Sequence, residues 1–124
     1  MQVTEIAFSV YPVTDIKRAR AFYEGTLGLT PGLVYEGDGI GWIEYEIGPG
    51  VVAIGAGFEH LKPSSMGGSV GLEVDDFDQA VNRLKEAGTK FVLEPLDFLG
   101  CRMAAVPDPD GNTVTIHRRK SSGS

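Results

Sequence analysis

The chain has 124 residues, a net charge of −6 and an isoelectric point near 4.8. Nucleic acids and anionic membranes need a basic face, so this acidic balance argues against both as partners. Hydrophobic residues make up 42% of the sequence, enough for the one compact domain that we expect over residues 1–120. No apolar run has membrane-spanning length, and Cys101 has no second cysteine to pair with, so we expect a cytoplasmic protein. Residues 121–124 are expected to be a disordered tail.

The first half of the chain predicts one strand, one helix and three further strands. Residues 5–11 are rich in strand formers and stop at a proline. Asp15 is a typical N-cap, and apolar residues at i, i+3 and i+4 spacing then indicate an amphipathic helix over 16–24. Three strands separated by glycine-rich turns are expected over 33–36, 41–47 and 51–55.

The second half repeats this order after a polar connector at 57–68. A strand at 69–74 leads to a second N-cap and an amphipathic helix over 77–87, and three more strands are expected over 91–94, 101–106 and 113–117. The capping residues Asp15 and Asp76 are 61 residues apart, as are the turn glycines Gly50 and Gly111. The chain is therefore an internal repeat of two modules, at about 3–57 and 67–118.

This repeat predicts the fold class. Each half reads strand–helix–strand–strand–strand, and one half is too small to bury a sheet face alone. We therefore predict an α+β fold in which two βαβββ modules form one curved, cup-shaped sheet with helices on its outer face.

Several motifs add a family resemblance over most of residues 3–118. They are Ala21-Phe22-Tyr23 with Leu27-Gly28-Leu29, Glu73-Val74-Asp75-Asp76, and Asp108-Pro109-Asp110-Gly111-Asn112. Together with the repeat they resemble the vicinal oxygen chelate superfamily, which includes glyoxalase I, extradiol dioxygenases and the bleomycin and fosfomycin resistance proteins. Similar proteins are commonly homodimers, so the resemblance implies a homodimer.

The resemblance also implies a divalent metal in the cup, bound by one His or Gln and one Glu from each half. The positions that correspond to these ligands hold Phe8, Ile54, Ser69 and Thr115. Phenylalanine and isoleucine cannot bind a metal, and neutral hydroxyl groups are poor ligands beside carboxylate or imidazole. The pattern looks more like the bleomycin-resistance type, which binds small molecules without chemistry, and we expect no metal cofactor.

The first functional hypothesis is therefore a metal-free protein that binds a small, partly apolar or aromatic molecule. An apolar wall and a few polar groups that fix the ligand's orientation are typical of such sites. The candidate wall is Phe8, Val10 and Ile54, and the candidate polar groups are Ser69, Glu73, Thr115 and His117.

Two enzymatic alternatives remain open. A lyase, isomerase or dioxygenase with a relocated metal would need three ligands from Glu44, Glu46, His60, Glu73 and His117. A metal-free enzyme would instead use Glu73 or His117 as a general acid or base. Glu73 is equally compatible with an exposed position at the end of a strand, and for His117 a partly exposed strand-end position beside the basic tail is the favoured interpretation.

Four other residues have less specific interpretations. Glu44 shares a strand face with Trp42, which suits either a cationic ligand or a solvated sheet face. His60 lies in the connector, as a surface residue or at the rim of a pocket. Arg102 is a candidate anchor for an anion, and Cys101 is expected to be a packed core thiol.

Overall fold

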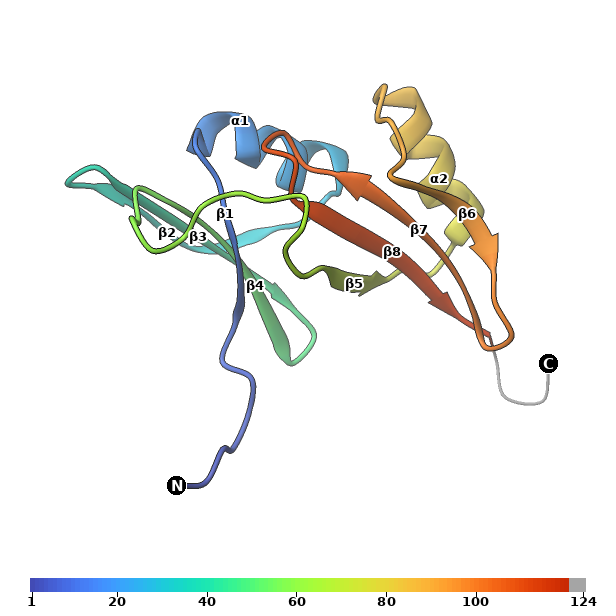
Figure 1. Ribbon diagram of the computed structural model, residues 1–124, viewed down its shortest axis with the longest axis horizontal. Helices are drawn as coiled ribbons and strands as arrows, with labels where there is room; N and C mark the ends of the chain where they lie inside the picture. Colours follow the sequence, from blue (N-terminus) through green and yellow to red (C-terminus); the bar gives the residue numbers. More distant parts are fainter. Residues whose placement is uncertain (121–124) are drawn as a thin grey trace. The chain divides into compact units, whose positions relative to one another are not determined.

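The computed structural model describes residues 1–120, which fall into two compact units, Met1–Pro63 and a second unit from Ser64 onward (Figure 1). Each unit is a βαβββ module built on a four-stranded mixed sheet, so the predicted α+β class and internal repeat are confirmed. The joining of both modules into one domain with a single cup stays a prediction. The predicted tail at 121–124 lies outside the described residues. None of the helices within 1–120 is both long and apolar enough to cross a membrane.

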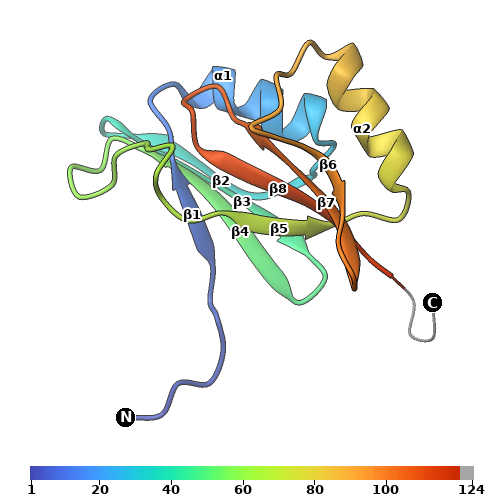
Figure 2. The ribbon, with the colours of Figure 1, turned by 45° about the vertical axis from the view of Figure 1, so that its right-hand side comes forward.

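The first unit follows the predicted order of elements. It contains β1 (Ser9–Pro12), α1 (Ile16–Arg20), the π-helix η1 (Ala21–Thr26), β2 (Pro31–Gly37), β3 (Ile40–Ile47) and β4 (Gly50–Ala56). The strand order is β1-β4-β3-β2, with β1 parallel to β4 and the other pairs antiparallel. The helical segment lies along one face of this sheet (Figures 1 and 2).

Strand β1 is shorter than residues 5–11, the range that composition predicts. Its register pairs Ser9 with Val52, which sets Ala7 level with Gly50, the first residue of β4. Residues before Ala7 therefore extend past the start of their partner strand, and strand-forming side chains alone do not make a strand without a partner.

The first helix begins as predicted and then changes type. The Asp15 side chain accepts a hydrogen bond of 3.1 Å from the Arg18 N–H and caps α1. From Ala21 the turns widen, and the Leu27 N–H donates to the Phe22 carbonyl at 2.9 Å, an i→i−5 bond. Phe22 and the next residue of this wider segment are both buried against the sheet.

A polar group is satisfied inside the core of this unit. The buried Tyr45 hydroxyl donates to Glu24 at 2.9 Å, and Glu24 also pairs with Arg20 at 2.6 Å. Burial and the hydrogen bond to Glu24 raise the pKa of Tyr45, and the Arg20 hydrogen bond lowers the pKa of Glu24. This triad fixes the helical segment to β3.

The second unit repeats the arrangement. It contains β5 (Val70–Glu73), α2 (Phe77–Glu86), β6 (Leu93–Asp97), β7 (Cys101–Pro107) and β8 (Thr113–Arg119). The strand order β5-β8-β7-β6 matches that of the first unit, with β5 parallel to β8. Asp76 caps α2 by accepting from the Gln79 N–H at 3.0 Å, as its position predicts. The helix buries Phe77, Val81 and Leu84 toward its sheet.

The loop between β7 and β8 is a compact turn of polar residues. The buried Asp108 carboxylate accepts from the backbone N–H groups of Asp110 and Asn112, both at 2.9 Å, and from the Asn112 side chain at 2.9 Å. Because the Asp108 N–H also donates to the Asn112 carbonyl at 2.7 Å, the ladder continues to this pair before the chain turns.

Candidate functional site

Each sheet has one face covered by its own helix and one face free of it, here called the open face. In the first unit Tyr45 marks the covered side, because its ring stacks on Tyr23 at 6.1 Å. Side chains alternate along a strand, so Trp42, Glu44 and Glu46 of β3 lie on the open face. Trp42 is paired with Tyr35 of β2 and Gly55 of β4.

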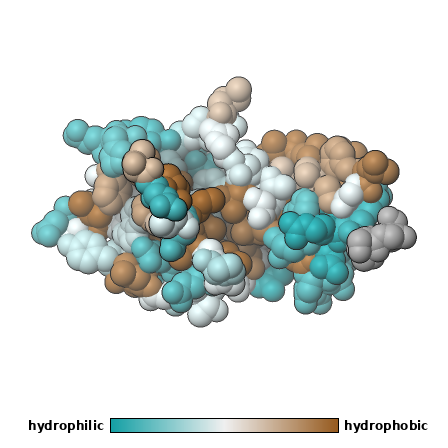
Figure 3. Space-filling model, turned by 90° about the horizontal axis from the view of Figure 1, so that it is seen from below, coloured by the Kyte–Doolittle hydropathy of each residue, from teal (hydrophilic) through white to brown (hydrophobic). Residues whose placement is uncertain are grey.

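An aromatic cluster covers part of this open face. It consists of Phe8, Trp42, Phe58 and His60. The Phe8 ring lies edge-on to Trp42 at 5.2 Å, Phe58 lies edge-on to Trp42 at 5.8 Å, and His60 lies edge-on to Phe58 at 6.0 Å. Edge-to-face geometry is one of the two favoured arrangements of aromatic rings. On the face seen in Figure 3, brown apolar areas lie exposed among teal polar ones.

Two neighbours fix the position of Trp42. A side chain at Gly55 would come within 3.1 Å of the Trp42 ring, so the absence of a Cβ lets the indole lie on β4. The indole N–H donates to the Glu44 carboxylate at 2.9 Å. Glu44 therefore orients the indole. The sequence suggested two other roles for Glu44, in a cationic-ligand site or on a solvated sheet face, and this contact is a third.

The structure corrects the placement of one candidate residue, Ile54. It is fully buried and is paired with Tyr11 and Ile43 on the helix-covered side, so it does not line the open face. Its neighbour Ala53 takes the open-face position beside Val10. Phe8 and Val10 do lie on that face, Phe8 in the cluster and Val10 half-buried on β1.

The cause is one extra residue in the second turn. The last ladder pair encloses two residues in the first unit, between Ile47 and Gly50, and three in the second, between Asp108 and Asn112. The offset of 61 residues therefore becomes 62 along the last strand, where Ile116 is equivalent to Ile54. A shift of one residue moves a strand side chain to the opposite face.

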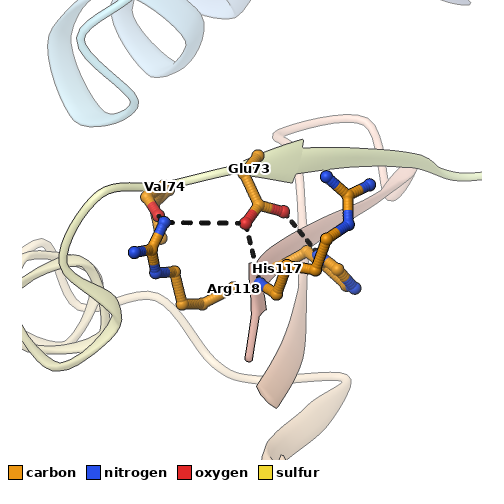
Figure 4. Close-up of polar contacts among 5 residues, drawn as sticks. Glu73, Val74, His117 and Arg118 are labelled. Carbon is orange, nitrogen blue, oxygen red and sulfur yellow. Dashed lines mark hydrogen bonds and ion pairs between the residues drawn. The ribbon is translucent and has the colours of Figure 1, made fainter. Parts of the chain in front are cut away.

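The open face of the second unit is polar along β5 and β8. Ser69 Oγ and Thr115 Oγ1 share a hydrogen bond of 2.6 Å. Glu73 and His117 are directly opposite each other in the parallel ladder, with Glu73 Oε1 at 2.6 Å from His117 Nδ1 (Figure 4). The structure thus brings together these four candidate residues as two cross-strand pairs.

Glu73 has more partners than its position in the sequence suggests. Its second oxygen accepts from the Arg119 backbone N–H at 2.7 Å and lies 3.8 Å from the Arg118 guanidinium (Figure 4). The backbone hydrogen bond from Arg119, followed by that from His117, lowers the pKa of the Glu73 carboxyl. Glu73 is therefore a carboxylate fixed by hydrogen bonds, and its pKa is lowered rather than raised by burial.

The remaining candidates have structural contacts. Arg102 pairs with Asp78 at 3.2 Å and Asp97 at 3.3 Å, and its guanidinium lies 4.5 Å over the Phe77 ring, so its charge is already compensated. Cys101 is half-buried at the start of β7. Within residues 1–120 no three His, Cys, Asp or Glu side chains gather as a metal site requires.

Sequence reasoning missed two parts of these faces. One is Phe58 in the polar connector at 57–68, where an aromatic residue two positions before His60 is a detectable signal. The other is Gly71, which lies between the candidates Ser69 and Glu73 on the same strand face. A Cβ at Gly71 would meet no atom within 4 Å, so this position leaves space on the open face of the second unit.

The comparisons with known proteins agree with this architecture. A family model described as Glyoxalase/Bleomycin resistance protein/Dioxygenase superfamily matches residues 5–116. The structure of TnmS3, an antibiotic binding protein from Streptomyces sp. CB03234, is similar with a TM-score of 0.82 and 25% identity, covering 97% of this chain and 99% of TnmS3.

Two further solved structures are similar. A glyoxalase/bleomycin resistance protein from Streptomyces sp. CB03234 has 27% identity and a TM-score of 0.76, covering 90% of this chain and 98% of its own. Virulence protein STM3117 from Salmonella typhimurium has 21% identity and a TM-score of 0.75, covering 97% of this chain and 100% of its own. The last likeness is one of fold alone.

Proposed function

Because the chain belongs to the Glyoxalase/Bleomycin resistance protein/Dioxygenase superfamily, we propose that it binds a small, partly apolar or aromatic molecule without the superfamily's usual metal centre. The similarity to TnmS3, an antibiotic binding protein, supports the binding of a small molecule. The open sheet faces carry the candidate binding residues.

The observation that carries the proposal is the aromatic cluster around Trp42. The indole is seated on Gly55, held at its N–H by Glu44 and flanked edge-on by Phe8 and Phe58. Rigid aromatic side chains provide contact area at a small entropic cost. A flat apolar or aromatic ligand would gain both burial and ring contacts on this surface.

The residues at the family's metal-ligand positions support the metal-free part of the proposal. With the corrected register these positions hold Phe8, Ala53, Ser69 and Thr115. Phe8 is used in the aromatic cluster, and the Ser69 and Thr115 hydroxyl groups bond to each other. Such a donor set does not fit a divalent metal, which prefers carboxylate and imidazole ligands.

The test uses Trp42 as a reporter, since it is the only tryptophan in the sequence. We would titrate the protein with flat aromatic compounds, beginning with acridine, and follow the tryptophan emission. Saturable quenching is expected. Phe8→Ala should weaken the binding roughly three- to tenfold, as expected for the loss of one aromatic contact.

The sequence offers a matched control in Phe98, which is 44% exposed, as Phe8 is, but lies in the second unit. Phe98→Ala should leave the titration unchanged. Quenching that never saturates, or that matches quenching of free tryptophan amide, would contradict the binding surface.

The metal-free part has its own test. Elemental analysis and melting curves with Mg²⁺, Mn²⁺, Fe²⁺, Ni²⁺ and Zn²⁺ are expected to show no stoichiometric metal and no saturable rise in melting temperature. A metal that binds only the native state must raise that temperature with concentration. A rise abolished by Glu73→Gln or His117→Ala would replace this proposal with a metal-dependent lyase, isomerase or dioxygenase.

A further inference from the structure

The connector that follows β4 is fixed at both of its ends. At its start Gly57 has a φ of 90°, and a Cβ on it would overlap the Gly39 carbonyl oxygen, so only glycine lets the chain pass the β2–β3 turn this closely. Farther along, the Ser64 N–H donates to the side-chain oxygen of buried Asn112 at 3.2 Å. Residues 58–63, here called the strap, join these two fixed points.

Between these points the strap is held by few contacts. The Leu61 N–H donates to the Phe58 carbonyl at 3.2 Å, so residues 58–61 form a single turn. The ring contacts of the strap found within residues 1–120 are Phe58 with Trp42 at 5.8 Å and His60 with Phe58 at 6.0 Å. The exposed residues of the strap are Glu59, His60 and Lys62. A segment with few buried contacts opens at a low cost in free energy.

The Phe58 ring covers sheet surface beside Trp42. A Cβ at Gly55 would lie 3.1 Å from the Trp42 ring and 3.3 Å from the Phe58 ring, so both rings rest on the same bare position of β4. Phe8 also contacts Trp42, at 5.2 Å, but it directly precedes β1. The two phenylalanines therefore differ in their attachment, because Phe8 adjoins a strand of the sheet whereas Phe58 is carried by the strap.

We propose that the strap is a lid, and that Phe58 is an internal occupant of the first unit's open face which an aromatic ligand displaces. This inference rests on the proposed binding of a flat aromatic molecule and adds how that site is regulated. Displacement exchanges one ring contact of Trp42 for another, and the structural change is confined to the strap. Because only molecules with an open lid bind the ligand, the lid lowers the apparent affinity in proportion to the open fraction.

The experiment compares Phe58→Ala with Phe8→Ala in two measurements on Trp42, the only tryptophan in the sequence. Without ligand, acrylamide should quench the tryptophan emission more strongly in Phe58→Ala than in the wild type, because the indole loses its cover. In acridine titrations Phe58→Ala should tighten binding roughly three- to tenfold, since one ring contact no longer has to be displaced. Phe8→Ala removes a contact that acridine does not displace, so it should weaken binding.

Two further variants test whether the strap moves. Phe58→Leu keeps an apolar side chain without a ring, so its acridine affinity should lie between those of the wild type and Phe58→Ala. Pro63→Gly lies outside the aromatic cluster and gives the strap more conformational freedom, which favours the open lid. It should therefore also tighten acridine binding, by a smaller factor. Phe98→Ala in the second unit is the control and should leave both measurements unchanged.

The outcomes separate the lid from the binding surface. An acridine affinity that falls or stays the same in Phe58→Ala, while Phe8→Ala weakens binding, would overturn the lid and keep the proposed function. Acrylamide quenching unchanged by Phe58→Ala would overturn the cover without any ligand. An affinity unchanged in Pro63→Gly would make Phe58 a fixed obstacle and overturn the movement of the strap. Acridine that binds none of these proteins would contradict the proposed function itself, and the lid with it.

Discussion

The two units of this protein share one scaffold but carry different chemistry on their open faces. In the first unit that face holds the aromatic cluster around Trp42, and its polar triad of Arg20, Glu24 and Tyr45 lies on the helix-covered side. In the second unit the polar pairs lie on the open face, and β8 buries Val114 and Ile116 under its helix. The covered faces hold each unit together, whereas the open faces are where the units differ.

This difference shows how a duplicated module acquires separate roles. The N-caps, the strand order and the parallel pairing of first and last strands are the same in both units. The open-face side chains contribute less to each unit's core, so they can vary while the fold is kept. Function must therefore be assigned for each face from its own residues.

The largest expected effect tests which side of the sheet is the core. Ile54→Ala and Ile116→Ala remove equivalent, buried side chains, 0% and 3% exposed, and each should lower the free energy of unfolding by about 2–5 kcal/mol. Thr115→Ala on the open face should cost only about 1 kcal/mol, the value of one hydrogen bond. Urea denaturation followed by circular dichroism measures all three. An Ile54→Ala cost no larger than that of Thr115→Ala would contradict the corrected register.

A prediction of intermediate size compares Glu24 and Glu73, the two glutamates whose carboxylates are fixed by hydrogen bonds. Glu24→Gln disturbs the pair with Arg20 and the hydrogen bond to the buried Tyr45 hydroxyl, and should cost about 1–3 kcal/mol at neutral pH. Glu73→Gln should cost less, because Glu73 is more exposed than Glu24, at 39% against 25% of the side chain.

The same two variants should differ from the wild type in their response to acid. The folded-state pKa of both Glu24 and Glu73 is lowered, so their stabilisation is fully present above the ordinary glutamate pKa and is lost as the pH falls through the lower folded-state pKa. Urea denaturation between about pH 7 and pH 3 should therefore show a flatter pH dependence in each variant than in the wild type. A wild-type slope in both variants would rule out this linkage.

The smallest effect tests whether the repeat is symmetric in its helix caps. Asp15→Ala and Asp76→Ala each remove a carboxylate that accepts from the backbone N–H three residues later, at 3.1 and 3.0 Å. Each should cost about 1 kcal/mol, and the two costs should be similar. Asp75→Ala, which removes an exposed carboxylate next to the Asp76 cap, serves as a control in the same thermal and urea measurements. A large cost for one cap alone would show that the units do not use this device equally.

Local features could be predicted because they depend on neighbours in the chain. Asp15 and Asp76 were identified as N-caps by their position before amphipathic runs, and both caps form. The repeat, the order of elements and the turn at Asp108 followed from periodicity and turn chemistry in the same way. Each of these depends on contacts within a few residues.

The register of the last strand in the first unit could not be predicted in this way. The 61-residue offset holds as far as β3 and β7 but becomes 62 along β4 and β8, because the second turn is one residue longer, so Gly50 and Gly111 are not structurally equivalent. That single residue decides whether Ile54 or Ala53 is on the open face. Hydrogen-bonded pairing with β3, rather than the pattern of β4 itself, settles the question.

The sequence by itself determined the family, the α+β repeat and the residue types available for binding, since these depend on motifs and periodicity. Only the tertiary structure decided which side chains meet. Glu73 and His117 are 44 residues apart, and Trp42 meets Phe8 and Phe58 from separate segments. The physical reason is that sheet pairing joins distant strands in a register set by turns and by burial of one face. The chemistry of each open face is the product of that pairing.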